Sequence, residues 1–166
     1  MSDIIYIMGV AGSGKTTIGK LLSLQTGSPF FDADDLHPAS NKEKMKAGNP
    51  LDDKDRQQWL YTLNLLAIEQ SKFKGTIIAC SGLKNKYRDI LATGISKPTW
   101  IFLEGSYEII YERMQKRKDH FMPPGLLRSQ FENLEVPEDA FMVDINNNPA
   151  KIVEMIMQHL LKKNQS

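Results

Sequence analysis

The sequence has one cysteine, no long hydrophobic run and almost no net charge. A single thiol, Cys80, excludes an intrachain disulfide and a multi-cysteine zinc or iron–sulfur site. No apolar run approaches the ~18 residues of a membrane span, and the first residues do not resemble a secretory signal. Because 21 Lys and Arg balance 20 Asp and Glu, the chain as a whole lacks the electrostatic footprint of a nucleic-acid or membrane binder. We therefore expect a cytoplasmic protein with neither kind of partner.

Short apolar runs instead alternate with helix-period segments along the 166 residues. This length fits one domain with a substantial core. The apolar runs lie at 4–8, 30–31, 76–80, 100–103 and 141–143. The alternation predicts an α/β fold, a parallel five-stranded sheet with helices on both faces and functional loops at the carboxyl ends of its strands.

Several predicted helices have readable ends. The segments 15–26 and 53–71 carry apolar residues at helical spacing. Ser106 stands where it can cap a helix, and Asn148 followed by Pro149 is typical of a helix start. Residues 40–43 (SNKE) form a capping-box pattern, which predicts that another helix begins with Ser40 as its cap.

Residues 9–16 (GVAGSGKT) fit the phosphate-binding pattern G-x-x-x-x-G-K-[ST], between an apolar run and a helical segment. Glycines in such a loop allow successive N–H groups to surround phosphate oxygens, and the following helix adds its N-terminal amides. Lys15 would reach the β- and γ-phosphates of ATP, and Thr16 would offer its hydroxyl to Mg²⁺. A strand-to-helix turn with a chance lysine is the alternative, which this context disfavours. The predicted nucleotide-binding residues are Gly9, Val10, Ala11, Gly12, Ser13, Gly14, Lys15, Thr16 and Thr17.

Acidic residues follow two of the apolar runs. Asp32 comes directly after the second run, and we expect it at the edge of the sheet as a ligand of Mg²⁺. Asp34, two residues on, could point to a neighbouring phosphoryl acceptor. Asp144 superficially resembles a second magnesium-binding acid, but the following residues 146–149 (NNNP) favour a turn and a helix cap.

The pattern N-K-x-D, with which GTPases read guanine, is absent: residues 41–44 are NKEK and residues 85–88 are NKYR. A one-domain chain with acids after its second strand fits a small-molecule kinase better than a GTPase switch.

Longer blocks of the chain resemble gluconokinases, in order from about Met8 to Pro137. They include residues 32–38 (DADDLHP), 48–51 (GNPL), 79–84 (ACSGLK), 87–89 (YRD) and 120–123 (HFMP). The resemblance implies ATP-dependent phosphorylation of D-gluconate to 6-phospho-D-gluconate. It also implies a P-loop fold like those of shikimate and nucleoside monophosphate kinases, and a homodimer.

A sugar acid needs cations for its carboxylate and hydrogen-bond partners for its hydroxyls. Arg56 and Arg88 are candidates for the carboxylate, with Lys84 beside them, because a guanidinium matches a carboxylate in two-point geometry. The alternatives are that Arg56 is an exposed helix-start residue paired with Asp53 or Asp52, and that Arg88 is a structural residue within a helix. His37 can bind a hydroxyl or serve as a loop cap.

Phosphoryl transfer requires mainly alignment and charge neutralisation. We expect Asp34 to orient the acceptor hydroxyl, whether or not it also removes the proton. Residues 117–125 (RKDHFMPPG) interrupt the fold pattern and are expected to form a lid, in which Arg117 resembles the family's lid arginine and would contact the transferring phosphoryl group. A solvated basic helix end is the alternative for Arg117.

Two other functions stay open on the sequence alone. One is a shikimate- or nucleoside-monophosphate-type kinase, and the other is an ATP-binding regulator without turnover.

Overall fold

A single parallel sheet organises the molecule, a computed structural model that describes residues 3–117 and 123–166. The strands are β1 (Ile4–Met8), β2 (Phe30–Asp32), β3 (Thr76–Ala79), β4 (Thr99–Glu104) and β5 (Phe141–Asp144), in the order β2-β3-β1-β4-β5. All four neighbouring pairs are parallel. Each of the five apolar runs therefore forms a strand, which confirms the predicted fold class.

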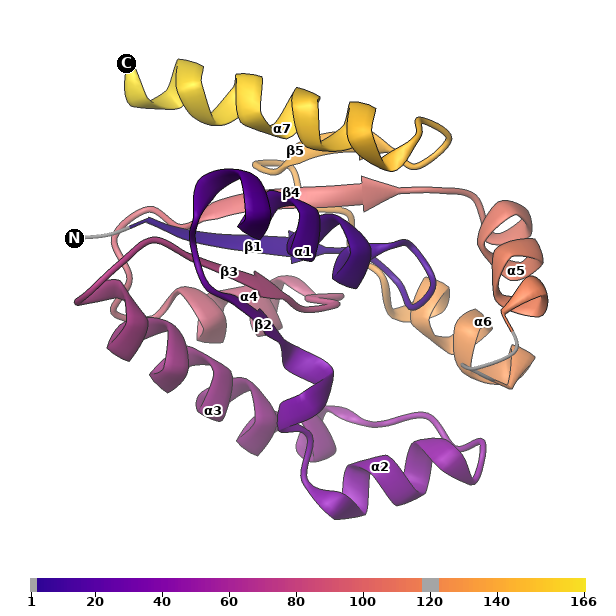
Figure 1. Ribbon diagram of the computed structural model, residues 1–166. Coiled ribbons are helices and arrows are strands. Elements are labelled where there is room, and N and C mark those ends of the chain that lie inside the picture. Colours follow the sequence, from indigo (N-terminus) through magenta and orange to yellow (C-terminus); the bar gives the residue numbers. More distant parts are fainter. Residues whose placement is uncertain (1–2, 118–122) are drawn as a thin grey trace.

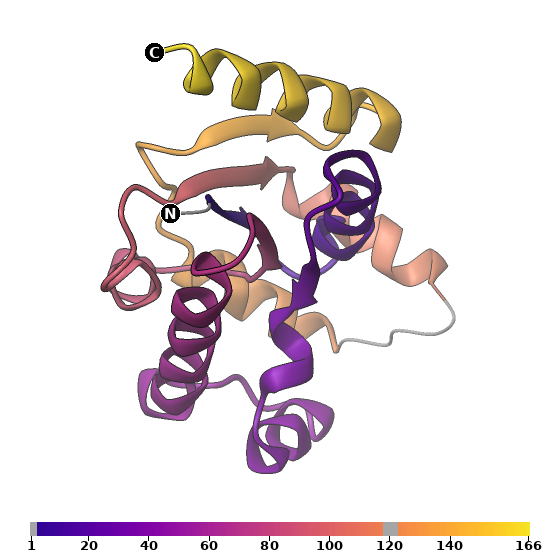
Figure 2. The same ribbon diagram turned by 60° about the vertical axis from the view of Figure 1, so that its left-hand side comes forward.

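Helices cover both faces of this sheet (Figures 1 and 2). On one face lie α1 (Lys15–Thr26) and α7 (Pro149–Asn164), and on the other lie α3 (Asp53–Ser71) and α4 (Asn85–Ala92). The remaining helical elements are a 3₁₀ turn η1 (Ala33–Leu36), α2 (Ala39–Lys46), α5 (Tyr107–Lys116) and α6 (Pro124–Asn133). In Figure 1 the arrows of the strands point towards α5 and α6, so these helices stand at the carboxyl ends of the strands.

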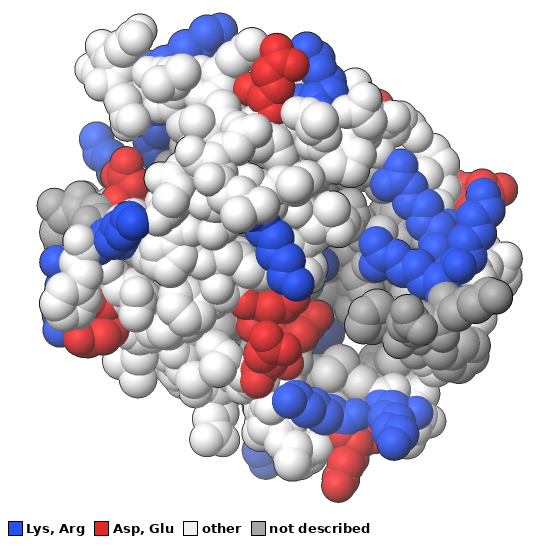
Figure 3. Space-filling model, in the orientation of Figure 1, with Lys and Arg blue, Asp and Glu red and all other residues white. Residues whose placement is uncertain are grey.

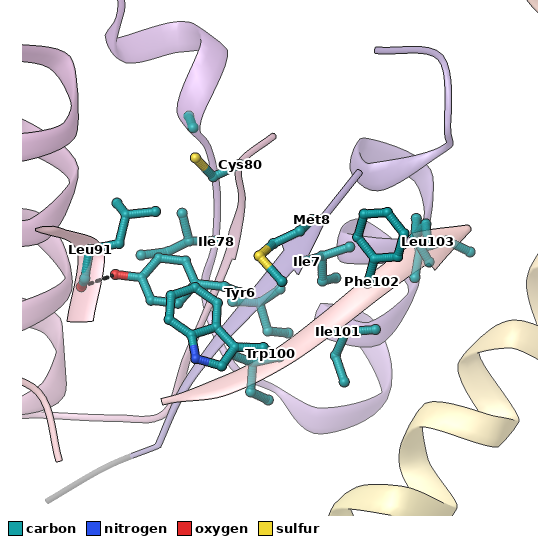
Figure 4. Packing of buried hydrophobic residues seen from close by; sticks show 14 of the residues in the cluster. Tyr6, Ile7, Met8, Ile78, Cys80, Leu91, Trp100, Ile101, Phe102 and Leu103 are labelled. Carbon is teal, nitrogen blue, oxygen red and sulfur yellow. Dashed lines mark hydrogen bonds between the residues drawn. The ribbon is translucent and has the colours of Figure 1, made fainter. Parts of the chain in front are cut away.

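The central strands are mainly apolar because helices bury them on both sides. All five residues of β1 and four of β3 are buried. Tyr6 stacks on Trp100 with ring centroids 4.6 Å apart, and its hydroxyl donates to the Leu91 carbonyl at 2.9 Å, as Figure 4 shows. The same core encloses Cys80, and burial raises the pKa of this thiol to about 12. Cys80 is thus a neutral packing residue at physiological pH.

Helix ends follow local sequence signals at most positions. The helices 15–26 and 53–71 have their predicted bounds. Ser106 and Asn148 act as N-caps, because the side chain of each accepts a hydrogen bond from the backbone N–H three residues later. The prediction for Ser40 is wrong, because the N-cap of α2 is Pro38, two residues earlier. Pro38 has the extended backbone of a cap and its carbonyl accepts from Asn41 N–H at 3.0 Å, so Ser40 lies within the first turn.

The predicted lid coincides largely with a part of the chain outside the described residues, 118–122. Arg117 is described and forms the C-cap of α5. Pro124 and Gly125, at the other end of the predicted segment, are the first two residues of α6.

Candidate active site

The phosphate-binding motif forms the connection between β1 and α1. Gly12 and Gly14 have φ values of 78° and 100°, which disfavour any residue with a side chain. Space matters as well as backbone angle, since a Cβ atom on Gly12 would lie 2.7 Å from Cγ of Met114 in α5. The loop is therefore closely packed against α5 and depends on its glycines for its shape.

Lys15 is folded back onto this loop. Its Nζ donates to the carbonyls of Gly9 and Val10, both at 3.0 Å. Burial lowers the pKa of Lys15, and the nearby carboxylates of Asp34 and Asp32 oppose that effect. The ammonium group thus lies within the electrostatic reach of both acids that the sequence singled out.

Ser13 supplies a further polar group in the same loop. Its Oγ is buried and has no hydrogen-bond partner within the described part of the chain. A buried hydroxyl without a partner is costly unless a ligand completes it. This donor, the loop amides and the Lys15 ammonium together suit a phosphate group.

Thr16 and Asp32 lie side by side at the edge of the sheet. Thr16 Oγ1 donates to Asp32 Oδ2 at 2.6 Å, and Asp32 Oδ1 accepts from the N–H of Asp34 at 3.0 Å. The second bond makes Asp32 the N-cap of η1, so it fixes both carboxylates relative to the loop. A hydroxyl beside one carboxylate fits Mg²⁺, which binds few protein ligands and completes its shell with water and nucleotide phosphates. No group of three or more His, Cys, Asp or Glu side chains suited to a metal occurs in residues 3–117 and 123–166.

These residues surround one cavity of about 890 Å³. Its wall includes the phosphate loop, the end of β2, Asp34 in η1, and Met114 and Arg117 from α5. Figure 3 shows acidic side chains at the centre of this face, with basic side chains over α5 and over α2 on either side. The structure therefore brings Lys15, Thr16, Asp32, Asp34 and Arg117 together, as the sequence predicted.

The cations predicted for the acceptor form a separate cluster, where the start of α3 meets α4. Arg56 is buried, not exposed, and its Nη1 donates to the Leu51 carbonyl at 2.7 Å and to the Tyr87 hydroxyl at 3.2 Å. Its guanidinium also lies over the Tyr87 ring, 5.4 Å from the centroid. Lys84 pairs with Asp53 at 3.1 Å, and Asp53 also accepts from the Tyr87 hydroxyl. Tyr87 thus connects the two cations.

Asp53 is the anionic centre of this cluster. Hydrogen bonds from Lys86, Tyr87 and Lys84 lower its pKa below the ordinary range. Sequence reasoning treated Asp53 only as a possible partner of Arg56, and it gave Tyr87 no role. No local pattern joins Asp53 to Tyr87, because they are 34 residues apart and meet only through packing of α3 on α4.

Arg88 points into a different network. Its guanidinium donates to the carbonyl of Gly82, the side chain of Asn85 and the carbonyl of Glu135, which follows α6. These bonds tie the loop after β3 to the end of α6. These contacts fit the structural alternative for Arg88, and its binding of the acceptor stays a prediction.

His37 is buried at the end of η1. Its ring stacks on Trp59 with centroids 4.0 Å apart, and Nδ1 lies 3.3 Å from Asn41 Nδ2. Burial, aided by the charges of Arg56 and Lys42, lowers the pKa of His37 to about 4. The imidazole is therefore neutral at pH 7, and it forms the C-cap position of η1.

Two further placements complete the site. Asp144 Oδ1 accepts from Asn146 N–H at 2.8 Å, in agreement with a turn-capping role. Gln130 of α6 reaches the phosphate loop, where its Oε1 accepts from Ala11 N–H at 2.7 Å. Sequence reasoning assigned no function to Gln130. No helix in the described residues is long and apolar enough to cross a membrane.

Known proteins that are similar to this chain include kinases of small molecules. Residues 11–161 match the family model for shikimate kinase. The thermosensitive gluconokinase of Escherichia coli is 46% identical, over 99% of this chain and 90% of the relative. An unliganded sugar kinase from Janibacter sp. HTCC2649 superposes with a TM-score of 0.91 at 38% identity, covering 96% of this chain and 95% of the other. A gluconokinase from Sinorhizobium meliloti 1021 gives a TM-score of 0.83 at 38% identity, covering 92% and 87%.

Proposed function

Because this chain belongs to the gluconokinase family, we propose that it transfers the γ-phosphoryl group of ATP to a hydroxyl of D-gluconate. The products are 6-phospho-D-gluconate and ADP. The observation that carries the proposal is the position of Asp34, which shares one cavity with the phosphate loop, while buried Arg56 and partly exposed Lys84 form a cluster of cations on the acceptor side. An ATP-binding regulator without turnover would need the phosphate loop, but it would need neither Asp34 at the cavity nor the cations on the acceptor side.

The nucleotide half acts by neutralising charge. The loop amides and the Ser13 hydroxyl would hold phosphate oxygens, and the Lys15 ammonium would exchange its bonds to Gly9 and Val10 for the β- and γ-phosphates. Arg117, at the cavity wall, supplies a further positive charge for the transferring group. We place Thr17, which also lines the cavity, with the α-phosphate side of the nucleotide.

Thr16 and Asp32 would hold Mg²⁺ together with the nucleotide. When bound, the ion neutralises phosphate charge and aligns the γ-phosphoryl group. Asp32 already accepts from Asp34 N–H, so the residue that positions the ion also positions the acceptor acid.

The acceptor half would recognise the sugar acid. Arg56 and Lys84, held next to each other by Tyr87 and Asp53, are the proposed partners of the carboxylate. Arg88 would assist mainly by shaping the loop that presents Lys84. His37 is neutral, and so it can exchange a hydrogen bond with a substrate hydroxyl without adding charge.

The chemical step is an in-line displacement. The acceptor oxygen forms a bond to the γ-phosphorus while the bond from that phosphorus to the β–γ bridging oxygen breaks, and the electron pair leaves with ADP. Asp34 aligns the hydroxyl and accepts its proton. Helix η1 holds Asp34 at the cavity through the Asp32 cap.

Substitution of the acceptor acid tests this function. Asp34→Asn should lower kcat for gluconate by about 10²- to 10⁴-fold, the usual contribution of a positioned general base. The KM for ATP should stay within about threefold, because the phosphate loop is unchanged. Asp35→Asn, one residue further along η1, is the matched control and should cost little. An ADP-release assay over gluconate, shikimate and nucleoside monophosphates measures both; turnover with a nucleotide acceptor alone would overturn the assignment.

We further propose that the protein works in the cytoplasm as a homodimer, without nucleic-acid or membrane partners. The near-zero net charge supports the absence of such partners. On α3, Tyr61 and Leu65 are exposed one turn apart, a surface that a second copy could cover. Light scattering of the purified protein measures the assembly directly.

A further inference from the structure

The phosphate loop makes a contact with α6 that the proposed reaction does not use. Gln130 Oε1 accepts from the backbone N–H of Ala11 at 2.7 Å, across 119 residues of sequence. Ala11 lies in the part of the loop that lines the cavity. Backbone N–H groups of such loops are the groups that bind phosphate oxygens, and here a carboxamide oxygen takes that place.

Two donors of the loop thus have partners within the protein. The Ala11 amide donates to Gln130, and the Lys15 ammonium donates to the carbonyls of Gly9 and Val10. An arriving triphosphate has to replace these bonds, since a carboxamide oxygen and a phosphate oxygen cannot both occupy the space in front of one N–H group. We propose that Gln130 is a positioning residue that competes with ATP for the Ala11 amide and thereby sets the affinity for nucleotide.

Helix α6, which carries Gln130, also contacts α5 and the loop after β3. In the second half of α6, Phe131 packs edge-to-face on Tyr107 of α5, with centroids 5.6 Å apart. Just beyond its end, Glu135 N–H donates to the Leu83 carbonyl at 2.7 Å, and the Glu135 carbonyl accepts from Arg88 at 2.9 Å. Leu83 precedes Lys84. Gln130 therefore lies on a helix that contacts both the phosphate loop and the acceptor side.

The test uses the full-length protein and titrates the magnesium complex of a non-hydrolysable ATP analogue by calorimetry, without gluconate. Gln130→Met keeps the length of the side chain but removes the acceptor, so the analogue should bind about fivefold more tightly, the equivalent of one ordinary hydrogen bond. Gln130→Glu keeps the acceptor and adds a negative charge, so binding should weaken by at least about tenfold. Gln158→Met, on the exposed side of α7, is the matched control.

Each outcome is decisive. Tighter binding by Gln130→Met with weaker binding by Gln130→Glu supports the competition, and the KM for ATP should fall in parallel in the first variant, which a merely destabilising substitution would not produce. Weaker binding by Gln130→Met would show that Gln130 is a ligand of the nucleotide, and unchanged binding would show that the contact is passive; both overturn the proposal. If Gln130→Met fails to fold, Gln130→Asn, which is one methylene too short to reach Ala11, replaces it. Because gluconate is absent, the result is independent of the identity of the acceptor.

Discussion

The nucleotide region and the acceptor region of this molecule are built in different ways. The nucleotide region comes from one continuous stretch, residues 9–17, with Asp32 added from the next strand. The acceptor region is assembled from the start of α3, from α4, and from the loops after β3 and α6. A local motif fixes its geometry through backbone angles, whereas a composite site fixes it through contacts between distant segments.

The two regions also differ in how they hold their cations. Lys15 donates to carbonyls of its own loop, and ligand phosphates can replace those bonds. Arg56 and Arg88 are buried and donate to the carbonyls of Leu51 and Gly82, which belong to the fold itself. Charge in the nucleotide region is therefore available for chemistry, while charge in the acceptor region contributes partly to stability.

The largest effect that separates the two regions is expected at Lys15. Lys15→Met should lower kcat/KM by about a thousandfold, because it removes the cation that faces the transferring phosphoryl group. The free energy of unfolding should change by less than about 1 kcal/mol, because the hydrogen bonds of Lys15 are local to its own loop and join no distant segments of the fold. Coupled ADP release and urea unfolding measure the two quantities. A large loss of stability with retained activity would contradict the contrast.

Substitution of Arg88 should mainly lower stability, whereas substitution of Lys15 should mainly lower activity, and the expected effect is somewhat smaller. Arg88→Met leaves the carbonyls of Gly82 and Glu135 without their donor in a buried place, which should cost roughly 3 kcal/mol of unfolding free energy. Arg128→Met, on the exposed face of α6, should change stability by less than about 0.5 kcal/mol. Urea unfolding of both variants gives the comparison. A loss below about 1 kcal/mol for Arg88→Met would show that its network is dispensable.

The sequence predicted the nucleotide region well because its signals are local. The spacing of glycines, Lys15 and Thr16 is itself the structure of the loop, and the apolar run before Asp32 placed that acid at the edge of the sheet. The five strands were equally readable, since burial on both faces leaves unbroken apolar runs. The helix start at Ser40 was not, because Pro38 takes the cap position two residues earlier.

The acceptor region shows where local reasoning ends. Residue type identified Arg56 and Arg88 as the important cations, but nothing in their sequence neighbourhood says that one stacks on Tyr87 and the other reaches Glu135. Those partners depend on how α3, α4 and α6 pack. For the same reason sequence reasoning gave Gln130 no role, although this residue contacts the most recognisable motif of the chain.

The smallest expected effect concerns His37, which links the regions between η1 and α3. Its pKa is about 4 in the folded protein, whereas an unfolded histidine titrates near 6.5. Between these values the unfolded state binds more protons, so stability falls as the pH falls through this window. By pH 4.5 the loss attributable to His37 should be roughly 2 kcal/mol relative to pH 7.

A variant that cannot titrate isolates this contribution from that of the carboxylates. His37→Phe retains a ring that can stack on Trp59, so it should lose about 2 kcal/mol less than the wild type between pH 7 and 4.5, measured by urea unfolding at each pH. His159→Phe is the control, because that imidazole is only half-buried against Phe141 and should affect the slope much less. Parallel pH profiles for wild type and His37→Phe would mean that the His37 imidazole accepts a proton at the start of α3 as easily as in water. The burial of His37 between Trp59 and Asn41 would then not be what keeps this imidazole neutral.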